Sequence, residues 1–488
     1  MSDDDSDDTF DNETDLEKLK RLRETVNWAN EDERFEFLRQ LFDLIDNWED
    51  ELPDLRDVLS KEEIDWLLAE SASARTAGWS KGKQLIDFVA RTGYKDEPRF
   101  DENGRPLLRY TTGLHWASIQ MKYEPVPDLF EIYHRRDVNY TDDSGLTHFH
   151  VACKTGCLEV VQKFLELGQD PNCLVRETGE SPLHHAVASR CEDVVRLLLD
   201  NGADPNLANA EGETPLHVCL RNSDDEGLTK LFFGIDDARR RIIQVDAPDK
   251  LGRTPLQWAV ANLMPDVIDA LLDRGADLSS FVFPTEDYFG HNSSQHLSET
   301  WENFHLRLAS GALEAVERLE KRGYELDLSG ATTIMHMFAR YVLFDQSPKD
   351  EELDECCWYD DEKFANQSKD LMVIPSLSLY DLIRMRQEEA EILVTPGDYF
   401  RFACEDHEWL LRGRYRLACA MHLCEKLARR FFRRWALNCF LVLTSQRLPI
   451  LCCDIVIEQL MNEDLYRICC AATGQKAHPL ITMLYDDY

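Results

Sequence analysis

The residues of this 488-residue chain that could bind a metal or act as nucleophiles are its fifteen cysteines and fourteen histidines. A structural zinc site takes Cys or His ligands in closely spaced pairs. The chain lacks a pair of Cys-x-x-Cys motifs. In a helix, the two side chains of a cysteine doublet would point to different sides, and this applies to the doublets 356–357, 452–453 and 469–470. The sequence therefore predicts no metal and no cofactor, and thiols that are mostly reduced.

Several of the histidines recur in one local pattern: Thr or Ser, Pro, Leu, His, any residue, Ala. Clear copies begin at Ser181, Thr214 and Thr254, and looser copies begin at Thr112 and Thr147. These five starts are separated by 35, 34, 33 and 40 residues. A recurring distance of this size indicates stacked helical repeats. Two degenerate copies follow at 304–316 and 333–336, so the pattern predicts about seven repeats over residues 104–345.

The residue types explain why each copy should form a pair of helices. Thr or Ser caps the first helix, and Pro at its first position needs no hydrogen-bond donor. Apolar residues at helical spacing then mark a second helix, as in residues 192–199. Gly202 would end that helix, and the turn that follows would lead into the next copy.

This pattern resembles the ankyrin repeat family, closely from Gly104 to Ala276 and more weakly to Phe344. In that family the motif histidine bridges backbone groups of neighbouring repeats. The resemblance therefore implies a structural role, and no metal binding, for His115, His150, His184, His217, His305 and His336. No residues in the sequence have the spacing of a nucleophile with its base or of a phosphate-binding loop. Cys153 and His184–His185 fall inside repeat helices. The chain is predicted not to be an enzyme.

The regions on either side of the repeats also have helical patterns. Residues 1–14 are too acidic to pack and are predicted to be a disordered tail. Residues 15–100 are predicted to be a helical cap, with a Ser60–Glu63 capping box. A net charge of −38 argues against nucleic-acid binding, and no segment is apolar enough to cross a membrane. The expected location is the cytoplasm, or else the nucleus.

Residues 350–488 are predicted to form a second helical domain. One of its helices carries Arg429, Arg430, Arg433 and Arg434 on one side. The row could be a solvated face beside a core stripe, or a patch for phosphate or an acidic partner. The fold class expected for the whole chain is all-α: an ankyrin-repeat solenoid with a helical N-terminal cap and a helical, F-box-like C-terminal domain.

The F-box-like part of that expectation depends on residues 448–465, which open with Leu-Pro and end with Asp-Leu. They resemble the first half of an F-box, which presents an apolar helical surface to the Skp-type adaptor of a cullin ubiquitin ligase. The resemblance implies adaptor contacts by Leu448, Pro449, Val456, Leu460, Asp464 and Leu465. Ile450 and Leu451 depart from the acidic residues usual there. An amphipathic helix that only closes the domain core is the alternative.

Ankyrin repeats followed by a truncated F-box resemble the PRANC architecture of poxvirus and parasitoid-wasp ankyrin proteins, as does the segment 377–382. The resemblance implies an adaptor whose repeats hold a target protein while the C-terminal helix recruits a Skp–cullin ligase. The alternative is a sequestering inhibitor of a signalling or transcription factor. The sequence does not identify the target. The expected target contacts are turn tips and groove residues: Ser144, Lys154, Thr178, Arg190, Ala210 and Leu251.

Overall fold

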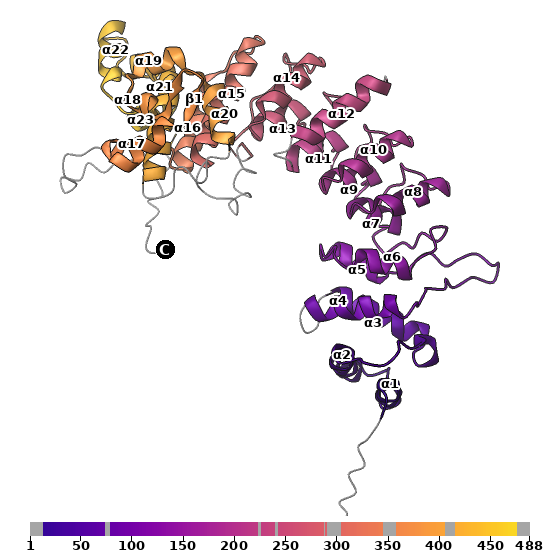
Figure 1. The fold of residues 1–488 in the computed structure, drawn as a ribbon. Coiled ribbons are helices and arrows are strands. Elements are labelled where there is room, and N and C mark those ends of the chain that lie inside the picture. Colours follow the sequence, from indigo (N-terminus) through magenta and orange to yellow (C-terminus); the bar gives the residue numbers. More distant parts are fainter. Residues whose placement is uncertain are drawn as a thin grey trace, which may run out of the picture. The chain divides into compact units, whose positions relative to one another are not determined.

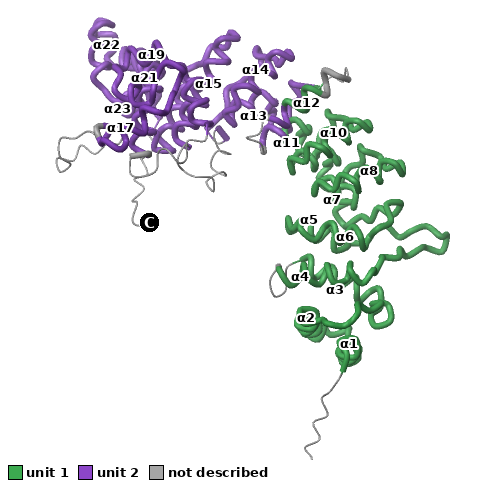
Figure 2. Tube along the Cα trace, in the orientation of Figure 1, with its two compact units in different colours: residues 1–218, 230–243 green, residues 219–229, 244–488 purple. Residues whose placement is uncertain are grey.

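The computed structural model describes residues 13–73, 79–222, 226–239, 243–286, 288–289, 304–344, 358–405 and 415–475 (Figure 1). These residues are mostly helical, and their named strands are one short antiparallel pair, β1 (Met372–Ile374) and β2 (Leu377–Ser378). The chain divides into two compact units, residues 1–218 with 230–243 and residues 219–229 with 244–488 (Figure 2). Of the predicted acidic tail, residues 1–12 lie outside the described residues.

The N-terminal region contains four α-helices and a 3-10 turn: α1 (Asp15–Glu24), α2 (Glu31–Asp46), η1 (Leu55–Asp57), α3 (Lys61–Ser73) and α4 (Trp79–Arg91). The predicted capping box is confirmed, because the Ser60 N–H donates to Glu63 Oε2 at 2.9 Å and the Glu63 N–H donates to Ser60 Oγ at 3.4 Å. Helix α3 packs against α5 and α4 against α6, the two helices of the first repeat. Their role as a solenoid cap stays a prediction.

Five helix pairs follow at the positions of the five predicted copies: α5 (Gly113–Ile119) with α6 (Val126–Ile132), α7 (His148–Lys154) with α8 (Leu158–Glu166), α9 (Pro182–Ala188) with α10 (Glu192–Asp200), α11 (Pro215–Asn222) with α12 (Glu226–Arg239), and α13 (Pro255–Ala261) with α14 (Pro265–Asp273). The side chains of Thr147, Ser181 and Thr254 cap first helices as expected. Between the two helices, a residue with positive φ turns the chain: Met121, Gly156, Arg190 and Leu263.

The predicted degenerate repeat at 304–316 differs from the five clear copies. Residues 304–321 form one continuous helix, α15 (Phe304–Lys321), without a turn between a first and a second helix. Gly311 lies inside this helix, and a β-carbon there would come within 3.0 Å of the Phe400 ring. Helix α20, which carries Phe400, thus packs closely against α15 at the place where the repeat pattern predicts a turn. The second degenerate copy also lies in a single helix, α16 (Leu328–Arg340).

The remaining helices surround the long helix α21 (Tyr415–Leu443), which packs against α15, α16, α22 and α23. They are, in chain order, η3 (Trp358–Asp360), α17 (Glu362–Lys369), α18 (Leu379–Arg384), α19 (Gln387–Leu393), α20 (Pro396–Cys404), α22 (Ile450–Glu458) and α23 (Asn462–Thr473). The C-terminal region is therefore helical, as predicted. No helix within the described ranges has the length and apolar character needed to cross a membrane.

A buried polar cluster lies in the first unit, where α3 meets the segments that precede α5 and α7. Lys61 forms ion pairs with both Asp65 and Asp96, and the Tyr140 hydroxyl donates to Asp96 Oδ2 at 2.7 Å. Asp65 is 2% exposed. Burial raises the pKa of its carboxyl, the charge of Lys61 lowers it, and the nearby Asp96 raises it further. One lysine therefore forms ion pairs with two buried carboxylates.

Replacing Asp65 by asparagine is expected to stabilise the first unit at neutral pH. The unfolded chain ionises Asp65 near the ordinary value of about 3.9, whereas the folded chain resists ionisation, so stability is lost as the pH rises through this range. Asp65→Asn removes that loss, and urea unfolding at pH 7 and pH 4 should show the gain at pH 7 only. Asp96→Asn, which weakens contacts to Lys61 and Tyr140, should destabilise the protein instead.

Candidate protein-docking surfaces

The motif histidines join neighbouring repeats. His184 Nδ1 accepts a hydrogen bond from the Ser181 N–H at 3.1 Å, and its Nε2 lies 3.0 Å from the Glu213 carbonyl oxygen. Because a carbonyl oxygen can only accept, the proton is assigned to Nε2. His115 and His150 repeat this geometry with Leu146 and Cys173. Burial lowers the pKa of both His115 and His150 to about 4, so these rings are neutral at pH 7.

Gln257 makes the equivalent pair of hydrogen bonds in the copy that begins at Thr254, which has no motif histidine. Its Oε1 accepts from the Thr254 N–H at 2.8 Å, and its Nε2 donates to the Val282 carbonyl oxygen at 2.9 Å. The bridging prediction is wrong for His305, whose Nδ1 is buried with no hydrogen-bond partner. It is also wrong for His336, whose Nδ1 lies 3.0 Å from Glu286 Oε2. Both residues lie in the single helices that replace the degenerate repeats.

Because Gln257 makes the bridging hydrogen bonds of a motif histidine, glutamine is an informative replacement for His184. His184→Ala leaves the Ser181 N–H and the Glu213 carbonyl without partners and should reduce the free energy of unfolding by about 2 kcal/mol. His184→Gln should retain most of that stability. Because burial lowers the pKa of His184, the stabilisation by the neutral ring is complete above about pH 6.5 and is lost as the pH falls below it. Urea denaturation of both variants at pH 7 and pH 5 would measure these differences.

The sequence of these helix pairs also matches a known repeat family. Residues 114–209 and 201–281 match the family model described as ankyrin repeats (3 copies). Residues 114–281 are thus similar to ankyrin repeats. The match stops before the two degenerate copies, which agrees with the single helices found there. A search of curated proteins returned no match to this chain. Ankyrin repeats are typically non-catalytic scaffolds that bind other proteins, which suggests a protein-interaction role for this segment.

The predicted target-binding residues occupy two kinds of position. Ser144, Thr178, Ala210 and Leu251 lie at turn tips, and in the first unit consecutive tips are joined by backbone hydrogen bonds, from Glu177 to Ser144 at 3.1 Å and from Ala210 to Thr178 at 2.7 Å. Leu251 is 76% exposed. The tips at Ser144, Thr178 and Ala210 are therefore held to one another by the backbone. Arg190 is one of the two predicted groove residues. It is exposed and occupies the positive-φ turn between α9 and α10.

Lys154 differs from the other predicted contacts. Its ammonium donates to the Ser118 carbonyl oxygen in the preceding repeat at 3.1 Å, and burial lowers its pKa. It contributes to the contact between repeats, a position that its spacing in the sequence did not indicate. Sequence reasoning also missed exposed apolar side chains in the first repeat, Ile119 and Met121, and in the segment before it, Phe100 and Leu107.

Helix α22 and its flanking turns carry a group of exposed apolar side chains in the C-terminal region. Leu451 is 73% exposed and Ile455 is 63% exposed. The surface is completed by side chains between 41% and 54% exposed: Leu448, Ile450, Val456 and Met461. These six residues are here called the α22 surface. An apolar surface of this kind is typical of a protein-docking site.

Only part of the predicted adaptor-binding set belongs to the α22 surface. Leu448, Pro449 and Val456 are exposed, but Leu460 is half-buried and Leu465 is fully buried on α23. Asp464 accepts a hydrogen bond from the Met461 N–H at 3.2 Å and so caps α23. The prediction of one exposed surface is therefore wrong for Leu465. The reason is that Leu465 lies in α23, which packs against α21.

Arg429 fixes the end of α22. Its guanidinium donates to the carbonyl oxygens of Ile457 at 3.1 Å and Glu458 at 2.9 Å, and also to the Leu460 carbonyl. Ile457 and Glu458 are the last two residues of α22, where backbone carbonyls lack the helical N–H partner four residues on. The Ile457 carbonyl also accepts from the Leu460 N–H at 3.2 Å. Burial lowers the pKa of Arg429.

The other members of the arginine row have different surroundings. Arg433 pairs with Asp454 at 3.1 Å, Arg434 pairs with Glu320 at 2.8 Å, and Arg430 is exposed. Of the four arginines, Arg429 is buried and supports the end of α22, whereas Arg430 and Arg434 are exposed, as expected of a solvated face.

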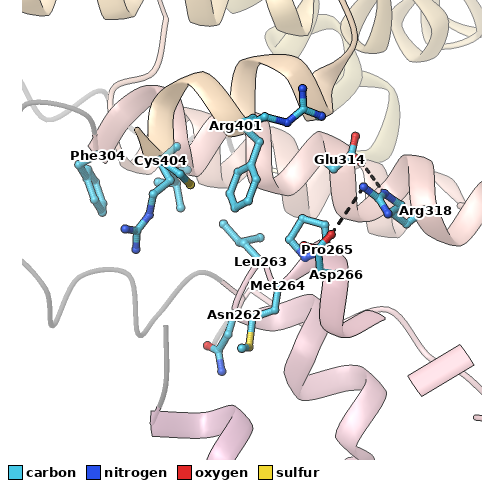
Figure 3. Close-up of a pocket in the computed structure, with 14 residues that line it drawn as sticks. Asn262, Leu263, Met264, Pro265, Asp266, Phe304, Glu314, Arg318, Arg401 and Cys404 are labelled. Atoms are coloured by element: carbon cyan, nitrogen blue, oxygen red, sulfur yellow. Dashed lines mark hydrogen bonds and ion pairs between the residues drawn. The ribbon is translucent and has the colours of Figure 1, made fainter. Parts of the chain in front are cut away.

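A pocket of about 450 Å³ lies between α20, α15 and the turn that joins α13 to α14 (Figure 3). Its lining mixes apolar groups such as Leu263 and Phe400 with charged ones. Arg318 is held by Glu314 at 2.5 Å and Asp266 at 3.8 Å, and it also pairs with Asp269. These charges are balanced within the protein. Within the described ranges, no group of three or more His, Cys, Asp or Glu could hold a metal ion.

Proposed function

We propose that this chain is an adaptor with two separate docking surfaces. The ankyrin repeats hold a target protein, and the α22 surface binds the Skp-type adaptor of a cullin ubiquitin ligase. Target and ligase are then brought together, and catalysis takes place on the ligase. The proposed site of action is the cytoplasm or the nucleus.

The observation that carries this proposal is the exposure of six large apolar side chains on and around α22. A helix that only closed a core would bury those side chains, which is the alternative raised by the sequence. The carbonyl contacts of Arg429 keep α22 in place without using its exposed face. Docking an apolar helical face into a partner's groove is a common mode of recognition. The resemblance of residues 448–465 to an F-box suggests the class of partner.

The test is an affinity purification from cells with the full chain and with the double variant Ile455→Asp, Val456→Asp. Both side chains are exposed, so the variant should fold, whereas charge on an apolar docking face should abolish recovery of a Skp–cullin complex. Ile392→Asp, at an 81% exposed site on α19, is the matched control and should recover the complex normally. Mass spectrometry of the recovered proteins gives the result.

Recovery of a target without any Skp or cullin by the wild-type chain would overturn the ligase part of the proposal. The chain would then act by sequestration, and its charge of −38 would suit a basic partner.

A further inference from the structure

The turn that joins the two helices of a repeat holds one residue in a left-handed backbone conformation. In the first and third repeats this residue is Met121, with φ of 54°, and Arg190, with φ of 58°. Such a conformation is unfavourable for a residue with a β-carbon. The second repeat has Gly156, with φ of 72°, at the equivalent position nine residues after the start of its copy. Glycine adopts this conformation without that cost.

Burial does not explain the choice of Met121 and Arg190 over glycine. Met121 is 74% exposed, its neighbour Ile119 is 50% exposed, and Arg190 is also exposed. Leu263 provides the contrast, because it has the same backbone conformation in the second unit but is only 6% exposed. Residues held in unfavourable backbone conformations are concentrated at functional sites. The exposed side chains of Met121 and Arg190 are therefore candidates for contact with a partner.

The turns of the first three repeats are neighbours in space. Helix α5 packs against α7, and α7 packs against α9. Lys154, at the end of α7, donates to the Ser118 carbonyl oxygen in the first repeat at 3.1 Å, and its own carbonyl oxygen lies 4.0 Å from the Cys191 sulfur in the third. Residues 119–122, 154–156 and 188–190 therefore form one continuous edge, here called the turn edge.

The turn edge differs in charge from the rest of the chain. The first helices and turns of these repeats contain three basic residues and no Asp or Glu: Lys122, Lys154 and Arg190, within residues 112–123, 147–158 and 181–191. The segments that follow contain eleven acidic and four basic residues: 124–137, 159–172 and 192–206. Acidic residues in the first turns of the second helices, such as Glu159 and Glu192, are partly offset by the positive end of the helix dipole.

We infer that the turn edge binds an acidic segment of the target protein. Met121 and Ile119 contact an apolar side chain of that segment, and Arg190 pairs with one of its carboxylates. A methionine side chain adapts to differently shaped apolar groups, and a guanidinium binds carboxylates in a bidentate geometry. This inference rests on the proposed function, in which the repeats hold a target, and adds the chemistry of the segment that they hold.

Two physical arguments favour this occupant. At physiological salt, exposed charges more than about 8 Å away are largely screened, so the basic residues of the turn edge act on a bound segment more strongly than the net charge of −38 does. A nucleic acid fits less well than a short peptide segment, because its long phosphate backbone would also meet the acidic residues of the second helices.

The experiment selects peptides from a phage-displayed random library on the purified full-length chain and measures the affinity of an enriched peptide by fluorescence polarisation. We expect enriched peptides that combine acidic residues with a large apolar residue. Met121→Gly and Arg190→Gly each remove a contact and relieve the backbone. Each should weaken binding about tenfold, while the urea unfolding midpoint stays the same or rises. A purely structural role would lower the midpoint instead.

Leu263→Gly is the matched control, because it changes the same backbone conformation at a buried side chain. It should lower the unfolding midpoint. Failure to enrich any peptide, enrichment of neutral or basic peptides, or an affinity that neither Met121→Gly nor Arg190→Gly changes would overturn the inference. A fluorescein-labelled oligothymidylate that binds as tightly as the acidic peptide would overturn it too, because the turn edge would then attract any polyanion.

The same preparations distinguish this inference from the ligase part of the proposed function. The double variant Ile455→Asp, Val456→Asp should bind the acidic peptide normally, because both residues belong to the other compact unit. Peptide binding by a chain that recovers no Skp–cullin complex supports the turn edge and contradicts the ligase function. Recovery of that complex by a chain whose peptides do not depend on Met121 or Arg190 contradicts the turn edge alone.

Discussion

Replacing Arg429 by alanine is expected to destabilise the second unit and to abolish docking at the α22 surface together. The substitution removes a donor to the carbonyls of Ile457, Glu458 and Leu460, of which the Ile457 carbonyl also accepts from the Leu460 N–H, and it removes a side-chain contact to Asn462 at 3.4 Å. Hydrogen bonds made by a charged group contribute about 1.5–3 kcal/mol each, and buried acceptors left unpaired cost more. The free energy of unfolding should therefore fall by roughly 3–5 kcal/mol.

Arg430→Ala is the matched control, because Arg430 is the next residue on the same helix and is exposed. It should change the unfolding midpoint little, as is usual for surface substitutions. Arg429→Lys keeps the charge but cannot reach several acceptors with one planar fork, so its stability should lie between wild type and alanine. Urea unfolding of the three variants measures the order. Equal midpoints for Arg429→Ala and Arg430→Ala would show that the guanidinium contributes no net stability.

The sequence predicted the five clear repeats well because each copy contains its own local signals for helix formation. A capping Thr or Ser, a Pro at the first helical position and a motif His act within a few residues of one another. Even Gln257 could have been assigned, since it follows its capping Thr254 by three residues, as His184 follows Ser181. The degenerate copies lack this local signal, and there the packing of Phe400 against Gly311 accompanies one continuous helix.

The C-terminal surface was only partly predictable for the same reason. A row of arginines gives no indication of which one faces the interior, because that depends on how α22 and α23 pack back against α21. Leu460 and Leu465 are apolar residues like Val456 in the sequence, yet only packing decides that Leu465 is buried and Val456 is exposed. Likewise, the contact between Lys154 and the Ser118 carbonyl joins residues 36 positions apart.

Replacing Leu183 by aspartate is expected to unfold the central repeats of the first unit. Leu183 is fully buried on α9, which packs against both α7 and α10. Leu→Ala substitutions in cores typically cost about 2–5 kcal/mol, and an ionised carboxylate at such a site costs more because it loses its hydration without gaining a partner. In a repeat array each copy depends on its neighbours, so the loss should spread beyond α9.

Circular dichroism should show a lower helix content for Leu183→Asp at 25 °C and an earlier, broader thermal transition. The matched control is Leu174→Asp, because Leu174 is 49% exposed in the turn that precedes the same copy, and it should leave the transition nearly unchanged. Target recovery should be lost with Leu183→Asp and kept with Leu174→Asp, while the α22 surface, which belongs to the other compact unit, should still recover its partner from cells. A thermal transition for Leu183→Asp like that of the control would contradict the repeat register, because a residue in the shared core cannot accept a charge without loss of stability.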